Sequence, residues 1–373
     1  MMPIAVFAMG ILLSVNSVAH AVSLPGEAIV GDYELTITAM GKTYTYRYPE
    51  IDVVGGEVYL KNVEEVVEGI YFDTVIKPID ASLKIYPERE NPFVYYSENS
   101  GAGIDCEKLV KDIKSALYAR KRNISAEVVT LMPTVTLAAL KEETKLLSTF
   151  STDYSNSQEE RKHNVGIATQ TIGGYALKSG AEFSFNEVVG ARTKERGYKS
   201  AKIIVGGEFT EGVGGGVCQV SSTLYNCALL AGLTVTERHN HSLLVSYVEP
   251  SFDAMVNSGS ADLKILNSKD SNVYIVASCN GGKIKFRIYG RNDGFEYKRI
   301  SVIDEYISPP AEEIVETADL ELGERRVVCA SKRGVKSSGY LVKYLNGKKI
   351  SETRLSKDSY AAVKGKVEIG TKI

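Results

Sequence analysis

The chain has 373 residues, a length that predicts two or three domains rather than one. Its content of 44% hydrophobic and 24% charged residues is typical of a globular protein with a buried core. The formal net charge is only −2 and no block of like charges occurs. The charge pattern therefore does not indicate nucleic acid or an anionic membrane surface as a partner.

The first 21 residues, MMPIAVFAMGILLSVNSVAHA, are predicted to direct export. They carry no charged side chain, contain an apolar run, and place Ala19 and Ala21 in the A-x-A arrangement of a cleavage site. The basic residues that usually open a signal peptide are missing, and an uncleaved anchor is the alternative. The sequence therefore predicts a secreted or cell-envelope protein that meets the membrane only through this segment.

Residues 30–147 are expected to form a first α+β domain. The runs YELTITAM, KTYTYRYP and ASLKIYP alternate apolar and polar side chains, as half-buried strands do. Asp105 is a predicted N-cap for an amphipathic helix, in which Leu109, Ile113 and Leu117 lie on one stripe. The run SAEVVTLMPTV is a further predicted strand.

Residues 148–295 are expected to form a central module of helices followed by an antiparallel sheet. Ser157 and Glu160 have the spacing of a capping box, and the helix that they begin is predicted to end at Gly173 and Gly174. The predicted strands are AEFSFNEVVG, AKIIVGGEF, LLVSYV, ADLKILN, NVYIVAS and KIKFRIYG.

The stretch YISPPAEEI has the composition of a linker, and residues 308–373 after it alternate in the manner of short strands. The predicted fold class is therefore α+β and multi-domain, with a central helix-plus-antiparallel-sheet module and a small all-β C-terminal domain.

The five cysteines are scattered and form no C-x-x-C pair, which argues against a zinc knuckle or a thioredoxin-type site. The odd number leaves at least one thiol free, or paired with another chain, in an oxidising compartment. Neither a cofactor nor a bound metal is part of the leading interpretation.

The segment GVGGGVCQVSSTLYNCALLAG combines a glycine-rich turn with a helical pattern. Gly214, Gly215 and Gly216 are predicted to bind substrate through a backbone that a ligand can approach closely. Cys218 falls in the first helical turn, where free N–H groups and the helix dipole stabilise a thiolate. Cys227 lies about half a turn out of phase and is predicted to be core. A phosphate loop is not favoured, because no Gly-Lys-Ser/Thr follows the glycines.

The order of reactive residues predicts thiol catalysis. Cys218 would be the nucleophile, His241 the base and Asp253 the residue that orients the base, with His239 as an alternate base. The two histidines are two positions apart and would share one face of a strand. Gln219, or backbone N–H groups at the helix start, would stabilise an oxyanion formed from an amide or ester carbonyl.

Two other interpretations stay open. His239 and His241 could hold a metal ion, with Cys218 or Asp253 completing the site, or the cysteine and histidine side chains could be structural. Arg192 and Arg196, in GARTKERGY, are candidates for binding a substrate carboxylate, and a solvated loop in which arginine pairs with Glu195 is the alternative.

The region from about residue 148 to 290 resembles the VanW family, most specifically in GGGVCQVSSTLYN and ERHNHS. Residues 30 to 145, around IYPERENPF and the helix after Asp105, are similar to the peptidoglycan-binding domain that often precedes this module. The tail, with Gly334, Gly347, Gly365 and a terminal GTKI, resembles the glycine-five domain, a small β module associated with cell-wall glycans.

The resemblance implies an exported cell-envelope protein, linked by its family name to vancomycin resistance, whose partner is peptidoglycan or its stem peptides. It does not imply a particular reaction. The leading hypothesis is a thiol-dependent acyl-transfer enzyme, either an amide hydrolase or a transpeptidase, and the runner-up is a non-catalytic peptidoglycan-binding protein.

Overall fold

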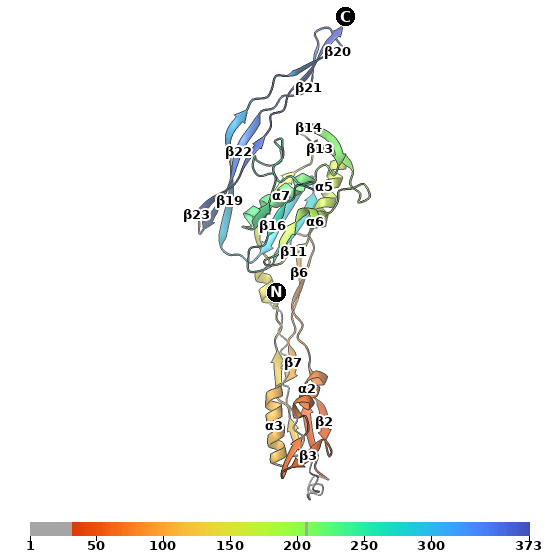
Figure 1. The fold of residues 1–373 in the computed structure, drawn as a ribbon, viewed down its shortest axis with the longest axis vertical. Helices are drawn as coiled ribbons and strands as arrows, with labels where there is room; N and C mark the ends of the chain where they lie inside the picture. The colour runs from red at the N-terminus through yellow and green to blue at the C-terminus, as the bar shows by residue number, and fades with distance from the viewer. Residues whose placement is uncertain (1–31, 206–207) are drawn as a thin grey trace. The chain divides into compact units, whose positions relative to one another are not determined.

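The computed structural model describes residues 32–205 and 208–373 (Figure 1). The described residues form two compact units, one from residues 32–79 and 99–134 and one from residues 80–98 and 135–373. The predicted export signal, residues 1–21, lies outside the described residues. Within the described ranges, no helix combines the length and apolar character needed to cross a bilayer.

The first unit contains two helices, one three-stranded sheet and two antiparallel strand pairs. The sheet has the order β2 (Lys42–Tyr46), β1 (Leu35–Ala39), β8 (Asn123–Ser125). The two pairs are the hairpin of β3 (Ile51–Val54) with β4 (Glu57–Leu60), and β7 (Gly101–Ile104) with β9 (Val128–Leu131), which α3 and β8 separate in the chain. The helices are α2 (Val63–Thr74), which the sequence analysis missed, and α3 (Cys106–Tyr118).

Helix α3 forms for the predicted reasons. The side chain of Asp105 accepts a hydrogen bond from the N–H of Lys108 at 2.9 Å, which caps the helix. Leu109, Ile113 and Leu117 are buried on one stripe against the sheet.

The second unit is built on a four-stranded antiparallel sheet with the order β10 (Lys145–Asp153), β18 (Lys283–Gly290), β17 (Val273–Asn280), β11 (Tyr175–Leu177). Helices α5 (Glu159–Ile172) and α7 (Val217–Leu230) pack on one face of this sheet (Figure 1). Smaller elements surround them: α4 (Leu137–Glu142), α6 (Phe185–Val189), the hairpin β13 (Ser200–Val205) with β14 (Glu208–Val213), and the sheet β12 (Glu182–Ser184), β16 (Lys264–Leu266), β15 (Thr234–Glu237).

The other face of the sheet is covered by a hairpin from early in the chain, β5 (Ser82–Ile85) with β6 (Phe93–Tyr96). Alternate residues of β17 explain both faces: Ile275 joins the helix-facing core, whereas Tyr274 packs edge-on against Phe93. Residues 80–98 and 135–147 therefore belong to the same compact unit as the central module. The predicted domain of residues 30–147 includes them with the first unit.

Six further strands form the C-terminal region. One sheet has the order β19 (Phe295–Ile307), β22 (Gly334–Leu345), β23 (Lys348–Tyr360), and the other has β20 (Glu313–Glu321), β24 (Lys366–Lys372), β21 (Arg325–Cys329). Strand β19 begins before the predicted linker YISPPAEEI, ends at Ile307 inside it, and pairs with β22, so this all-β region draws on residues that precede position 308. The α+β class with an all-β end is confirmed.

Four local predictions are wrong. Residues 243–248 form a loop and not a strand. AEFSFNEVVG forms only the short strand β12 before Ser184 caps helix α6 with a hydrogen bond from the N–H of Glu187. Helix α5 has Gln158 as its N-cap residue without a side-chain cap, so no capping box forms. His241 lies beyond strand β15, which ends at Glu237.

Candidate active site

The glycine-rich turn brings strand β14 into the start of helix α7. Gly214 and Gly216 have positive φ angles of 88° and 106°, which other residues rarely adopt. A Cβ atom on Gly215 would lie 2.7 Å from the carbonyl oxygen of Lys202, so only glycine permits this close approach. The turn fixes where the helix begins and therefore places Cys218 in its first turn.

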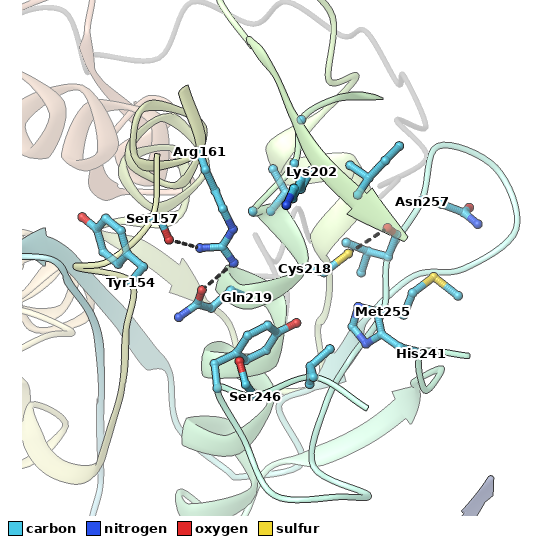
Figure 2. A pocket seen from close by; sticks show the side chains of 18 of the residues that line it. Tyr154, Ser157, Arg161, Lys202, Cys218, Gln219, His241, Ser246, Met255 and Asn257 are labelled. Carbon is cyan, nitrogen blue, oxygen red and sulfur yellow. Dashed lines mark hydrogen bonds between the residues drawn. The ribbon is translucent and has the colours of Figure 1, made fainter. Parts of the chain in front are cut away.

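Cys218 lies partly exposed at a pocket (Figure 2). The pocket has a volume of about 1230 Å³, and the three glycines also line it. Its Sγ atom lies 3.4 Å from the carbonyl oxygen of Val256. Cys227 behaves as predicted: it is fully buried in the core, and burial raises the pKa of its thiol to about 12. All five cysteines are free thiols.

His241 and Asp253 lie next to this thiol. Nδ1 of His241 lies 2.6 Å from Oδ2 of Asp253, and the N–H of His241 donates to the same oxygen at 2.7 Å. The carboxylate occupies Nδ1, so Nε2 is the ring nitrogen left for Cys218. The structure thus brings together the three residues that the sequence analysis ordered as nucleophile, base and orienting carboxylate.

The electrostatics of the pair favour its charged form. Burial acts to raise the pKa of the Cys218 thiol, but the hydrogen bond and charge of His241 outweigh it and lower that pKa. Burial acts to lower the pKa of His241, but the hydrogen bonds and charges of Asp253 and Cys218 raise that pKa to about 9. These opposite shifts describe a thiolate beside an imidazolium.

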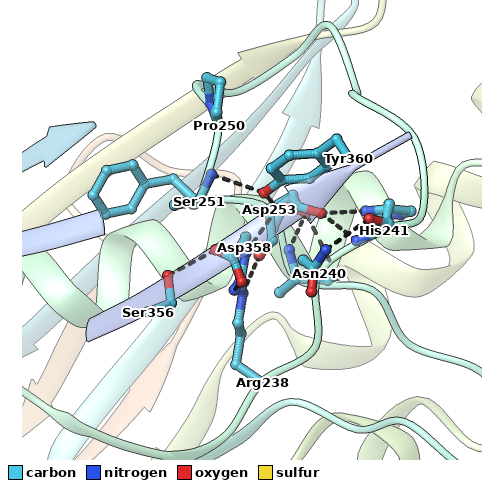
Figure 3. A network of polar contacts seen from close by, with 12 residues as sticks. Arg238, Asn240, His241, Pro250, Ser251, Asp253, Ser356, Asp358 and Tyr360 are labelled. Atoms are coloured by element: carbon cyan, nitrogen blue, oxygen red, sulfur yellow. Dashed lines mark hydrogen bonds and ion pairs between the residues drawn. The ribbon is translucent and has the colours of Figure 1, made fainter. Parts of the chain in front are cut away.

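Asp253 is held by groups other than His241 (Figure 3). Its Oδ1 atom accepts hydrogen bonds from Nη2 of Arg238 at 2.7 Å and from the hydroxyl of Tyr360 at 2.6 Å. Burial acts to raise the pKa of Asp253, and the hydrogen bond of His241 and the charge of Arg238 hold it below its usual value. The buried carboxylate therefore stays ionised.

The pocket is rich in cations. Arg161, Arg192, Lys202 and Lys332 line it, and among the described lining residues Asp153 is the only carboxylate. Neither arginine forms an ion pair with a carboxylate among the residues that the structure describes. Burial lowers the pKa of both guanidinium groups.

Three predicted site residues have other partners. Gln219 is buried, its amide group donates to Thr152 and to the carbonyl of Asp153, and its oxygen accepts from Arg161 at 2.7 Å. Both of its N–H groups are therefore taken. The backbone N–H groups of Val217 and Gln219 also have acceptors, the carbonyls of Gly214 and Gly216, so an oxyanion would be bound instead by the backbone N–H of Cys218.

His239 and Arg196 do not line the pocket. Nε2 of His239 lies 3.1 Å from a carboxylate oxygen of Glu237, and the guanidinium of Arg196 donates to the carbonyls of Val189 and Ala191. The described residues also contain no group of three or more His, Cys, Asp or Glu side chains arranged to hold a metal ion. With His239 directed elsewhere, the ligand set of the metal interpretation is not assembled.

Sequence reasoning missed several residues of the site. Arg161 lies on α5, far from Cys218 in the sequence. Arg238 lies within ERHNHS, three residues before His241, and this closeness to the candidate base is a signal that could have suggested it as a partner for Asp253. Tyr247 lines the pocket from a loop that was predicted to be a strand. Tyr360 offers no local signal, because it lies 107 residues from Asp253 in the sequence.

Fold and site together define an α+β domain with a thiol-containing pocket, joined to a small all-β domain. A family model described as VanW like protein matches residues 160–289, and the G5 domain model matches residues 299–372. The chain belongs to the VanW-like family and carries a C-terminal G5 domain, which confirms both resemblances. The resemblance of residues 30 to 145 to a peptidoglycan-binding domain stays a prediction.

Two relatives and one solved structure illustrate the similarity. YoaR of Bacillus subtilis is 31% identical over 265 residues, which cover 68% of this chain and 84% of YoaR. Vancomycin B-type resistance protein VanW of Enterococcus faecalis is 30% identical over 138 residues, 35% of this chain and 50% of that protein. The G5 domain structure of an IgA1 protease is 26% identical, covers 21% of this chain and 92% of that chain, and has a TM-score of 0.16.

Proposed function

We propose that this VanW-like protein is a cysteine-dependent acyl-transfer enzyme that acts on amide bonds in the stem peptides of peptidoglycan. The observation that carries the proposal is the arrangement of Cys218, His241 and Asp253 at the start of helix α7, in a pocket open to a ligand. The roles are nucleophile for Cys218, base and then acid for His241, and orienting carboxylate for Asp253.

The chemistry follows from these positions. The Cys218 thiolate attacks the amide carbonyl, a sulfur–carbon bond forms, and the carbonyl electron pair moves to the oxygen, which the backbone N–H of Cys218 stabilises. His241 then gives the proton on Nε2 to the leaving amine as the carbon–nitrogen bond breaks. Attack by water on the acyl-enzyme completes hydrolysis, whereas attack by a second amine completes transpeptidation.

The charge of the pocket supports an anionic substrate. Arg161 and Arg192 are largely withdrawn from water, and no described carboxylate forms an ion pair with either of them. A cation held in this way is costly unless an anion joins it, and a peptide carboxylate is an ion that guanidinium groups bind in a bidentate manner. We assign Arg192, the predicted carboxylate reader, and also Arg161 to substrate binding, together with the backbone of Gly214, Gly215 and Gly216.

A position in the cell envelope belongs to the same proposal. The predicted export segment at residues 1–21 supports this position, and so does the similarity to a relative named vancomycin B-type resistance protein VanW. Export would place the site next to peptidoglycan, and the name of the relative supports a link to antibiotic resistance.

One observation favours the alternative of a non-catalytic wall-binding protein. The 3.4 Å contact between Sγ of Cys218 and the carbonyl oxygen of Val256 is one that a neutral thiol makes by donating its S–H. A thiol held in that state would be a poor nucleophile, and the pocket would then bind stem peptides without reacting with them.

Thiol labelling of the full chain separates the two functions. Cys227 has a pKa of about 12 and Cys218 has one below the ordinary 9.0, so iodoacetamide at pH 7 is expected to label Cys218 at least about 30-fold faster, after allowance for the lower nucleophilicity of the weaker base. Peptide mass spectrometry measures both rates. Incubation with a stem peptide should also leave an acyl group on Cys218.

The variant His241→Gln serves as the control, because it removes the imidazolium and is expected to slow labelling of Cys218 but not of Cys227. Slow labelling of Cys218 and Cys227 at equal rates, unchanged in His241→Gln, would overturn the enzymatic proposal and favour the binding protein.

A further inference from the structure

The carboxylate of Asp253 receives a contact from a different domain of the chain. Tyr360 is the last residue of strand β23, lies within the region matched by the G5 domain model, and is buried at 1% exposure. Its hydroxyl donates to Oδ1 of Asp253 at 2.6 Å and accepts from the N–H of Ser251 at 2.8 Å (Figure 3). Burial and the charge of Asp253 raise the pKa of this phenol, so it stays a protonated donor.

A second residue of the same strand acts through Arg238. Asp358 accepts a hydrogen bond from Nη1 of Arg238 at 2.7 Å, while Nη2 of the same guanidinium binds Asp253 and its Nε atom binds the carbonyl oxygen of Asp253 at 2.6 Å. Ser356 in turn donates to Asp358 at 2.7 Å. The two carboxylates thus hold one buried guanidinium in a fixed orientation.

Further contacts fix strand β23 and its neighbour β22 against the loop that carries the site. The N–H of Ala361 donates to the carbonyl of Ser242, next to His241, at 2.8 Å. The hydroxyl groups of Ser251 and Ser337 lie 2.7 Å apart and are buried. These contacts hold the loop at Ser242 and at Ser251, and Tyr360 holds Asp253 itself. The position of the Asp253 carboxylate therefore depends on the G5 domain.

We propose that Tyr360 and Asp358 are positioning residues of the candidate active site, and that the G5 domain is therefore part of the catalytic unit. This inference rests on the proposed function. The mechanism is direct: Tyr360 and Arg238 together occupy Oδ1 of Asp253, which leaves Oδ2 facing both the ring and the backbone N–H of His241. Loss of either donor allows the carboxylate to rotate away from the imidazole.

The test depends on the pH at which Asp253 becomes protonated. Several titratable or charged groups face this carboxylate. They are Arg238, His241, Tyr225, Tyr247 and Tyr360, and Asp358 reaches it through Arg238. Both Tyr360 and Arg238 favour the ionised carboxylate. Removing the hydroxyl of Tyr360 is therefore expected to move the protonation of Asp253 to higher pH.

The experiment measures the rate of Cys218 alkylation by iodoacetamide from pH 4 to pH 10 in the full chain. On the acid side of this profile, protonation of Asp253 releases His241 and so slows alkylation of Cys218. Tyr360→Phe is expected to move this acid limb upward by about one pH unit, the effect of one hydrogen bond to a charged group. Asp358→Asn, which keeps the phenol, is expected to move it in the same direction by less. Tyr344→Phe, on the neighbouring strand β22, is the matched control and should leave the profile unchanged.

A purely structural role for Tyr360 would lower the melting temperature of Tyr360→Phe without moving the limb, and that result would overturn the inference. If Tyr360→Phe does not fold, the profile of Asp358→Asn decides by the same criterion. Failure of the proposed function is distinct, because Cys218 would then react no faster than Cys227 in the unmodified chain.

Discussion

Asp253→Asn is the substitution that tests the site most directly, because it removes one negative charge and keeps the shape of the side chain. The pKa of His241 is about 9 in the folded chain, against an ordinary value of 6.5. A return to the ordinary value corresponds to about 3.4 kcal/mol, at about 1.36 kcal/mol for each pKa unit. This figure is an upper bound for Asp253, because Cys218 also raises the pKa of His241.

The change alters the charge of the site in the neutral range. At pH 8 a histidine with a pKa of about 9 is protonated in about nine of ten molecules, whereas one with a pKa of 6.5 is almost entirely neutral. Cys218 in the variant therefore loses the adjacent cation, its thiolate becomes less populated, and alkylation at pH 7 to 8 slows.

The free energy of unfolding should follow the same groups. The pKa of His241 is raised on folding, so its stabilising contribution is complete below pH 6.5 and is lost as the pH rises through about 9. The pKa of Asp253 is lowered on folding, so its contribution is present above the ordinary 3.8 and is lost as the pH falls below it. The stability difference between the parent chain and Asp253→Asn should therefore shrink between pH 7 and pH 10.

The assay is a nuclear magnetic resonance titration of the chain labelled in its histidines, with His241→Gln to assign the signal. The remaining histidine signals report whether each variant is folded. The reasoning is refuted if the His241 signal titrates at the same pH in the parent chain and in Asp253→Asn, or if it titrates near 6.5 in both.

Three further changes probe the pocket and its frame. Arg161→Gln should reduce the preference of Cys218 for anionic iodoacetate over neutral iodoacetamide by about threefold to tenfold. Lys162→Gln, on the same helix but outside the pocket, should leave this preference unchanged. If the iodoacetate-to-iodoacetamide rate ratio is the same in both variants, Arg161 does not form an anion site. Gly216→Ala, at φ 106° with a Cβ 2.9 Å from the Arg161 side chain, should cost about 1–3 kcal/mol in urea unfolding, and an unchanged midpoint would contradict the strain argument. Cys227→Ala should cost about 1–2 kcal/mol through the cavity it leaves, yet should keep the alkylation rate of Cys218.

The sequence was sufficient where a feature depends on neighbouring residues. The period of the apolar residues and the glycines around α7 placed Cys218 in its first turn and Cys227 in the core, and the structure has both there. The spacing of Cys218, His241 and Asp253 fits the same explanation, because short connections leave these residues little room to separate. The histidine that points away, His239, could not be distinguished from His241 because both precede the same loop.

The remainder of the site depends on distant segments. Arg161 reaches the pocket from α5, and Tyr360 reaches Asp253 across 107 residues of sequence. Residues 243–248 alternate in the manner of a strand, but they form a loop that contributes to the pocket wall. Periodicity describes which side chains are buried, and it does not show whether a neighbouring backbone is available to pair with the segment.

The charges around Cys218 decide between a reactive and an inert thiol. Transfer of the thiol proton to His241 creates one negative and one positive charge, so the net charge of the buried group that includes Asp253, Asp358 and Arg238 does not change. The cost of the transfer is thus the cost of separating charges over a short distance, and not that of burying a new net charge. The contact of Sγ with the carbonyl oxygen of Val256 suits a neutral thiol that donates its S–H. The backbone hydrogen bond of Val256 and the guanidinium of Arg192 both act to lower the pKa of Cys218 and so favour the thiolate.

The proposed anionic substrate would change this balance on binding. By pairing with Arg192 it would weaken the attraction of that guanidinium for the thiolate, so His241 would have to hold the charge of Cys218 in the complex. The network that keeps Asp253 ionised and directed at His241 would then be required most when the pocket is occupied. A domain remote in sequence would then supply Tyr360 and Asp358, because the short segment that carries the proposed nucleophile and base cannot by itself hold Asp253 in place.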